Sequence, residues 1–222
     1  MSCMNNETLQ FIQKNKIVAI ARNIDPKDIV DAAQALYDGN IRLMEITYNQ
    51  KLDRCIEDTT ESIRLVREKF NGRMVIGAGT VMTPLQMMKA YEAGAAFILS
   101  PNVDETIIKL TKQLGLVSIP GALTPTEIVT AYQYGADFVK LFPAGSLGAD
   151  YVKNIMGPIN HIPLMLVGGI DEQNMKDYLK VGITSFGLGS NILKSEYIKN
   201  RNFSAITELA KKYASIIKDY EK

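Results

Sequence analysis

The chain has 222 residues, of which 46% are hydrophobic and 22% charged, and 25 basic residues nearly balance 24 acidic ones. This length is typical of one soluble domain, and a net charge of +1 gives no electrostatic reason to expect binding to nucleic acid or to a membrane surface. No apolar run approaches the roughly 18 residues that span a membrane. The polar start lacks the order of a signal peptide and only two cysteines are present, so we expect a cytoplasmic protein. A single histidine, His161, argues against a zinc or iron enzyme.

Residues 5–15 are predicted to form a short leading helix, and beyond them short apolar runs alternate with helix-length segments. Eight strands are predicted at a spacing of roughly 24 residues, which is about one strand–helix unit each. Their centres lie near Ala19, Glu45, Gly77, Ile98, Ser118, Lys140, Leu166 and Phe186.

Four of the predicted helices share the same start and stop signals, a polar capping residue before the first turn and a glycine at the end. They run from Asp25 to Gly39, Thr83 to Gly94, Thr124 to Gly135 and Asp171 to Gly182. Thr83 with Gln86, and Thr124 with Glu127, match the capping box, in which each side chain bonds an otherwise unpaired backbone N–H. This repeated pattern indicates strand–helix units of one fold rather than a mixture of domains.

The C-terminal segment completes the pattern, with apolar residues at helical spacing at Phe203, Ile206, Leu209, Tyr213, Ile216 and Tyr220. No linker or low-complexity tract divides the chain. We therefore predict one α/β domain over residues 1–222, a single (β/α)8 TIM barrel with an extra N-terminal helix. The main alternative, a doubly wound open sheet, would normally need a glycine-rich turn after its first strand, and residues 18–23 have none.

Two charged side chains interrupt strands that should be almost wholly apolar in a parallel barrel. Glu45 lies in residues 43–47 and Lys140 in residues 138–142. Each could reach water at a strand end, or the two could form a structural ion pair. In the functional interpretation, burial lowers the pKa of Lys140 from about 10.4 by roughly three units, which leaves enough neutral amine to attack a ketone. Glu45 would then shuttle protons to and from hydroxyl groups.

Glycine turns follow the last two predicted strands, at Gly168-Gly169 and at Gly189-Ser190. Barrels often bind phosphate with the loops after strands seven and eight, because glycine lets backbone amides approach the anion. Arg22, at the end of the first strand, could pair with a substrate carboxylate or form a salt bridge at the rim. The sequence therefore predicts a phosphate site beside the charged pair.

The order of several short motifs resembles the 2-keto-3-deoxy-6-phosphogluconate (KDPG) and 4-hydroxy-2-oxoglutarate (KHG) aldolase family over essentially the whole chain. These motifs are Arg22, Glu45-Ile46-Thr47, Gly77-Ala78-Gly79-Thr80, Ser100-Pro101-Asn102, Ile119-Pro120-Gly121, Lys140-Leu141-Phe142-Pro143 and Val167-Gly168-Gly169. The resemblance implies a (β/α)8 barrel, a homotrimer, and a class I aldolase that uses a lysine Schiff base with no metal or other cofactor. Its substrate would be a small keto-acid phosphate, with no nucleic-acid or membrane partner.

The resemblance also implies residue roles. Lys140 would form the Schiff base and Glu45 would be the general acid and base. Thr80 and Arg22 would neighbour the pyruvyl carboxylate, and the phosphate would be held by Gly168, Gly169, Gly189 and Ser190. The implied reaction cleaves a 2-keto-3-deoxy-6-phospho sugar acid to pyruvate and glyceraldehyde 3-phosphate, and 4-hydroxy-2-oxoglutarate to pyruvate and glyoxylate.

Two positions depart from the common pattern of the family. Asn49 stands where many members carry an arginine that binds the carboxylate, a role that Arg22 would take over here. Val167 replaces a threonine that is common in the gluconate-type enzymes and resembles the branch that acts on the galactonate epimer. The epimer therefore stays open. Two other functions also stay open: a phosphosugar epimerase or isomerase on the same barrel, and a phosphosugar-binding module without catalysis.

Overall fold

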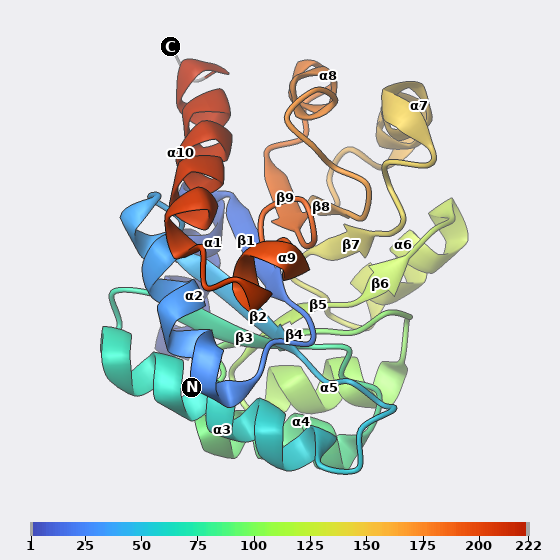
Figure 1. Ribbon diagram of the computed structural model, residues 1–222. Helices are drawn as coiled ribbons and strands as arrows, with labels where there is room; N and C mark the ends of the chain where they lie inside the picture. Colours follow the sequence, from blue (N-terminus) through green and yellow to red (C-terminus); the bar gives the residue numbers. More distant parts are fainter. Residues whose placement is uncertain (1, 221–222) are drawn as a thin grey trace.

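Parallel strands and helices alternate along the chain in the computed structural model, which describes residues 2–220 (Figure 1). The strands gather at the centre with helices around them. They are β1 (Ile17–Ala21), β2 (Leu43–Thr47), β3 (Val75–Gly79), β4 (Phe97–Leu99), β5 (Val117–Ile119), β6 (Gly121–Ala122), β7 (Val139–Leu141), β8 (Leu164–Val167) and β9 (Ser185–Leu188). The helices are α1 (Ser2–Asn15), α2 (Pro26–Asp38), α3 (Cys55–Phe70), α4 (Pro84–Ala93), α5 (Glu105–Gln113), α6 (Pro125–Gln133), α7 (Gly148–Ile159), α8 (Met175–Lys180), α9 (Ser195–Lys199) and α10 (Phe203–Tyr220).

All predicted strand centres fall inside strands, and the strand order β5-β4-β3-β2-β1-β9-β8-β7-β6 is that of a parallel barrel. The fifth predicted strand is divided into β5 and β6 by Pro120, which has no N–H to give to a ladder. The barrel still closes at this point. The Ser118 carbonyl accepts the N–H of Phe138 at 3.3 Å, and the Pro120 carbonyl accepts that of Lys140 at 2.8 Å. The predicted (β/α)8 barrel with a leading helix is confirmed.

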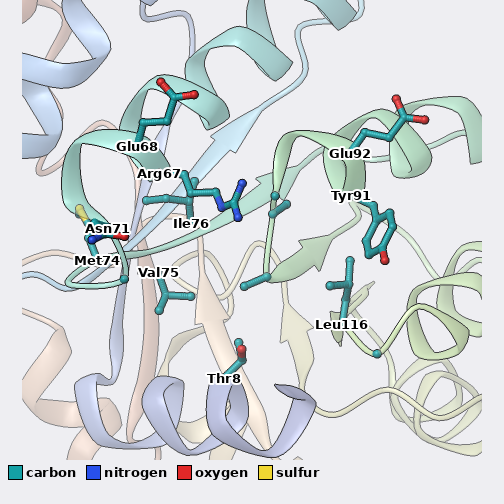
Figure 2. Close-up of a pocket in the computed structure, with 15 residues that line it drawn as sticks. Thr8, Arg67, Glu68, Asn71, Met74, Val75, Ile76, Tyr91, Glu92 and Leu116 are labelled. Carbon is teal, nitrogen blue, oxygen red and sulfur yellow. The ribbon is translucent and has the colours of Figure 1, made fainter. Parts of the chain in front are cut away.

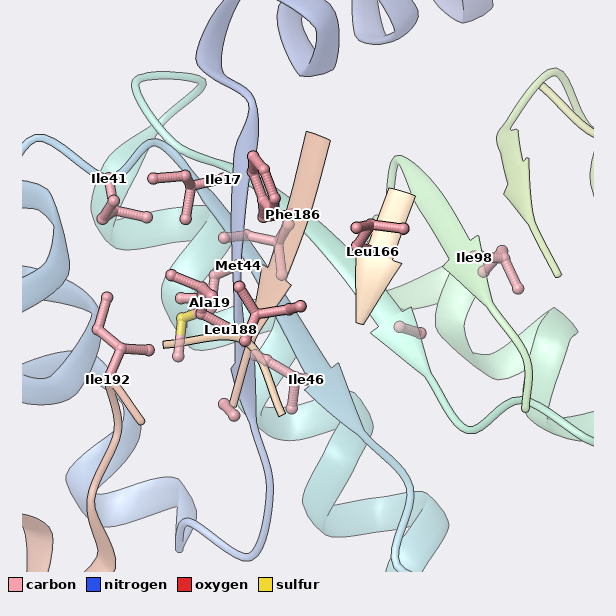
Figure 3. Close-up of a cluster of buried hydrophobic side chains, with 14 of the residues drawn as sticks. Ile17, Ala19, Ile41, Met44, Ile46, Ile98, Leu166, Phe186, Leu188 and Ile192 are labelled. Atoms are coloured by element: carbon pink, nitrogen blue, oxygen red, sulfur yellow. The ribbon is translucent and has the colours of Figure 1, made fainter. Parts of the chain in front are cut away.

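Two sets of apolar side chains follow from the alternation of each strand between its two faces. One set fills the barrel interior: Val18, Ile20, Leu43, Phe97, Leu99, Val117, Ile119, Phe138, Met165 and Val167, joined by Ile12 of α1. The other lies between strands and helices, and Figure 3 shows part of it, including Ala19, Met44, Ile46, Leu166 and Phe186. Because Ile12 packs with the interior set, α1 covers the end of the barrel where the strands begin.

The helix ends agree with the predicted caps and glycine stops, with three differences. Asp25 precedes α2 as predicted, but its side chain makes no capping hydrogen bond. The Thr124–Glu127 capping box is complete, whereas in the Thr83–Gln86 pair only the threonine side chain caps, accepting the Gln86 N–H at 3.2 Å. The helix α8 begins at Met175, later than the predicted start near Asp171. Asp171 forms a turn instead, because its carboxylate accepts the N–H of Asn174 while the Asn174 side chain accepts that of Asp171.

The predicted apolar face of the last helix is buried in part, with Phe203, Leu209 and Ile216 half-buried. Ile206 and Tyr213 are buried, together with Ala210 and Ile217, whereas Tyr220 is 51% exposed at the helix end. Over residues 2–220, no helix combines the length and the apolar character needed to cross a bilayer.

Candidate active site

Glu45 and Lys140 both point into the barrel. Each is two residues from an interior apolar side chain, Leu43 and Phe138 respectively, and therefore lies on the same face of its strand. Glu45 is fully buried and Lys140 is 5% exposed, so neither reaches water at a strand end. They form no hydrogen bond or ion pair with each other in the described part of the chain, although each acts electrostatically on the other. The two charged side chains are thus close and desolvated without being a structural ion pair.

Gly79 of β3 makes room for the carboxylate, and Gly77 makes room for the Phe97 ring. A Cβ at Gly79 would collide with Oε1 and Cδ of Glu45, and one at Gly77 would collide with the Phe97 ring. The Glu45 side chain therefore occupies the volume that a side chain on β3 would otherwise fill. This explains why the sequence needs Gly79 in the interior of a strand, where glycine otherwise costs stability; Gly77 is needed for the Phe97 ring instead.

Burial moves both groups toward their neutral forms. Burial raises the pKa of Glu45, and the positive charges of Lys140 and Arg22 only partly oppose this shift. Burial likewise lowers the pKa of Lys140; Glu45 opposes this shift, while Arg22 adds to it. Among the described residues, no group forms a hydrogen bond with either oxygen of the Glu45 carboxyl. A buried polar group without a partner is uncommon in a stable fold and marks a place where a ligand can bind.

The side chain of Arg22 meets Thr80 at the same end of the barrel. Arg22 follows β1 and Thr80 follows β3, and the guanidinium donates to the threonine Oγ1 at 3.4 Å. Asn49 is engaged differently, because its amide donates to Asn23 Oδ1 at 2.8 Å and its oxygen accepts the N–H of Lys51. The Arg22–Thr80 pair therefore offers a guanidinium and a hydroxyl next to the charged pair, and Asn49 belongs to the outer loop.

The glycine turns after β8 and β9 are joined to each other. Gly168 and Gly169 have φ values of +85° and +73°, which favour glycine, and Asn191 donates its amide to the Ile170 carbonyl at 2.6 Å. This bond ties the segment that holds Gly189 and Ser190 to the Gly168-Gly169 turn. In the described part of the chain, the N–H groups of Gly169 and Ser190 have no acceptor, so both are free to bind an anion.

The segment after β7 connects the lysine to the first glycine turn. Ala144 and Gly145 donate their N–H groups to the carbonyls of Val167 and Gly168, at 2.9 and 2.7 Å. The Phe142 ring lies 5.1 Å from Lys140 Nζ, and a Cβ at Gly168 would meet that ring at 2.9 Å. Phe142 therefore stands between the amine and the turn. The sequence offered no separate signal for this position beyond its place in the Lys-Leu-Phe-Pro motif.

Arg22, Thr80 and the two glycine turns follow the carboxyl ends of their strands, where barrel enzymes carry their active sites, and Glu45 and Lys140 lie inside the barrel. A cavity of about 810 Å³ lies at the opposite end, between α1 and the C-terminal ends of α3 and α4. Figure 2 shows Arg67, Val75, Tyr91 and Leu116 around it. None of the predicted site residues lines this cavity, so its size does not identify it as the reaction site.

Known proteins share both the family and the fold of this chain. The family model described as "KDPG and KHG aldolase" matches residues 9–209. A probable 2-dehydro-3-deoxy-6-phosphogalactonate aldolase of Rhizobium meliloti is 34% identical over 80% of this chain and 82% of its own. A 2-dehydro-3-deoxy-phosphogluconate aldolase of Haemophilus influenzae is 31% identical over 98% of this chain and all of its own.

A solved structure adds a chemical observation. The KDPG aldolase of Legionella pneumophila, crystallised with pyruvate captured as a covalent carbinolamine, superposes with a TM-score of 0.81 at 29% identity, covering 91% of this chain and 96% of its own. With its parallel barrel, its buried lysine and glutamate, and a family match over nearly its whole length, this chain belongs to the KDPG and KHG aldolase family of carbon–carbon lyases.

Proposed function

We propose that this chain is a class I aldolase that cleaves a 2-keto-3-deoxy-6-phospho sugar acid, of gluconate or galactonate type, to pyruvate and glyceraldehyde 3-phosphate. The observation that carries the proposal is the desolvated pair, with the pKa of Lys140 lowered and that of Glu45 raised. An uncharged amine and a protonated carboxyl are the two partners that a Schiff-base reaction needs at its start.

Formation of the Schiff base uses both neutral groups. The Lys140 amine attacks the C2 ketone carbon, and a proton moves from nitrogen to oxygen to give a carbinolamine. Glu45 then donates its proton, directly or through a water, so that the hydroxyl leaves as water. The products of this stage are an iminium cation on Lys140 and an ionised Glu45, whose charges stabilise each other in the buried site.

Cleavage of the substrate and release of the products return Lys140 and Glu45 to their neutral forms. The Glu45 carboxylate removes the proton of the C4 hydroxyl, the C3–C4 bond breaks, and its electrons pass to the iminium to give an enamine. Glyceraldehyde 3-phosphate leaves, and Glu45 returns the proton to C3. Hydrolysis of the pyruvyl iminium releases pyruvate and leaves a neutral Lys140 and a protonated Glu45. Because the iminium is the electron sink, the scheme calls for no metal.

The surrounding groups would orient the substrate. Arg22 and Thr80 bind the carboxylate, and the turns at Gly168-Gly169 and Gly189-Ser190 bind the phosphate through free N–H groups. A substrate without phosphate, 4-hydroxy-2-oxoglutarate, would use only the first of these sites and give pyruvate and glyoxylate. The relatives named for the galactonate and gluconate epimers both match this chain, and the apolar Val167 favours the galactonate type.

We also propose that the protein is cytoplasmic and assembles as a homotrimer. Met82 and Leu85 near the start of α4 are 49% and 56% exposed, and Leu123 before α6 is 38% exposed; a trimer interface would cover such apolar side chains. Light scattering after size-exclusion chromatography should give three times the chain's 24.6 kDa; the mass of a monomer would contradict the assembly.

Borohydride reduction in the presence of pyruvate tests the function. We expect peptide mass spectrometry to find the reduced pyruvyl adduct on the peptide that contains Lys140, and Lys140→Ala to lose both the adduct and turnover. Lys112→Ala is the matched control, since this lysine pairs with Asp137 at 2.6 Å and should leave the adduct unchanged. Pyruvate binding without an adduct would favour an epimerase or a binding module instead.

A further inference from the structure

Thr80 holds a backbone conformation that its side chain disfavours. Its φ is +56°, in the left-handed region, where a β-branched residue is a rare exception. Such conformations persist when the surrounding structure holds them, and they concentrate at ligand sites. The Thr80 hydroxyl is also the group that accepts the hydrogen bond from Arg22. Whatever holds this backbone therefore also decides where the hydroxyl points.

A chain of two side-chain amides holds the Thr80 backbone. Gln50 donates its side-chain N–H to the Thr80 carbonyl at 3.0 Å, and Gln86 donates its own to Gln50 Oε1 at 2.8 Å. Gln86 is 3% exposed, and its Oε1 accepts the Met82 N–H at 2.9 Å. Its backbone carbonyl accepts the hydroxyl of the buried Tyr48 at 2.8 Å. Gln86 is thus fixed at every polar atom of its side chain.

The matching position of α6 shows what is special about this glutamine. Both helices have a threonine cap and begin with proline, and their third residue is Gln86 in α4 and Glu127 in α6. Glu127 accepts the N–H groups of Leu123 and Thr124 at 2.8 Å, so a carboxylate is sufficient to cap such a helix. Only an amide has, in addition, an N–H to donate. In Gln86 that extra donor is the one that reaches Gln50.

We propose that Gln86 is a positioning residue that, through Gln50, holds Thr80 in its left-handed conformation and so presents the Thr80 hydroxyl, with Arg22, to the carboxylate of the substrate. This inference rests on the proposed function. Gln86 touches neither the reacting atoms nor the carboxylate, and it acts on binding rather than on the chemistry of Lys140.

The test is Gln86→Glu, which keeps the cap and removes the donor to Gln50. With pyruvate and borohydride, we expect the half-saturating pyruvate concentration to rise about fivefold to tenfold, the worth of one hydrogen bond, with the trapping rate at saturation changed less than about twofold. Gln50→Leu, at an exposed position, should give the same rise. The two together should give no more than either alone. Glu127→Gln is the matched control and should leave the half-saturating concentration unchanged.

The Thr80→Gly background separates positioning from general destabilisation. Glycine adopts the left-handed region without strain, so Gln86→Glu should have no further effect there. An unchanged half-saturating concentration in Gln86→Glu, or the same rise in the Thr80→Gly background, would overturn the inference while leaving the proposed function intact. Absence of the adduct in the unsubstituted chain would overturn both.

Discussion

Gly79→Ala tests whether the position of the Glu45 carboxyl is set by the empty volume on β3. The added Cβ would collide with Oε1 and Cδ of Glu45, so the carboxyl has to move or β3 has to shift. Gly79 does not have a positive φ, so alanine brings no backbone strain, and the whole effect comes from this collision. Inserting one methyl group into a packed interior costs about 1–3 kcal/mol. For a chain of this size that lowers Tm by roughly 2–12 °C.

The effect on catalysis should exceed the effect on stability. A displacement of a reacting group by about 1 Å can reduce the rate by about a hundredfold. We therefore expect a fall of about that size in the exchange of pyruvate methyl protons with deuterated water, which reports proton transfer at C3. The trapping of pyruvate on Lys140 should remain detectable, because the amine itself is not displaced. Nuclear magnetic resonance measures the exchange, and thermal unfolding measures the stability of the same samples.

Two further variants make the result interpretable. Gly157→Ala adds a methyl where no atom lies within 4 Å and should leave exchange unchanged. Glu45→Asp shortens the side chain, so adding it to Gly79→Ala should recover part of the lost Tm. Exchange within about twofold of the unsubstituted chain in Gly79→Ala, with an unchanged Tm, would refute the reasoning, because the carboxyl would then not need that volume.

Three other outcomes are expected. Glu45→Gln should raise Tm at pH 7. Burial raises the pKa of Glu45, so the folded chain loses stability as pH rises above the unfolded carboxyl pKa of about 4.3. Thermal unfolding at several pH values should show that the gain in Tm shrinks toward pH 4, and a constant gain would contradict the pKa shift. Ser190→Asp should raise KM for the phosphorylated substrate about tenfold or more through charge repulsion, without changing KM for 4-hydroxy-2-oxoglutarate; equal effects on both would remove Ser190 from the phosphate site. Val167→Thr should move the ratio of kcat/KM toward the gluconate epimer by up to about a hundredfold, measured with the two epimers in parallel, and an unchanged ratio would exclude this position as a determinant.

The fold followed from the sequence because its signals are local and repeated. A glycine caps the end of α2 and of α4 and follows the cap of α6, and apolar runs mark the strands, so each strand–helix unit can be recognised from its own residues. The errors lie where contacts decide between local options. The helix α8 starts later than predicted because the side chains of Asp171 and Asn174 each accept a hydrogen bond from the other's backbone N–H and form a turn. The interruption at Pro120 was visible as a residue, but the carbonyl pairing that closes the barrel around it was not.

Glu45 and Lys140 could be singled out from the sequence, because a charged residue within an apolar strand is unusual. What the sequence left open was their environment. Arg22 and Thr80 are 58 residues apart, and only the barrel brings them within hydrogen-bond distance. Gln86 carried a predicted capping role, and its second role depends on Gln50, 36 residues away. Phe142 gave no signal because an aromatic residue after a strand is ordinary, and its place over Lys140 follows from the chain path after β7.

The protonation states of the buried pair show most clearly why spacing alone was insufficient. An opposite charge nearby favours the ionised forms of both Lys140 and Glu45, and burial favours the neutral forms of both. The residue types are the same in either case, so the sequence permits an ion pair as readily as a reactive amine. In the structure Glu45 has no hydrogen-bond partner among the described residues and Lys140 is almost fully enclosed, so burial is the largest influence on the pKa of each and favours its neutral form. Burial of these two groups destabilises the folded chain. In the proposed reaction the same burial strengthens the attraction between the positively charged iminium and the negatively charged carboxylate, so the two charges stabilise each other without water.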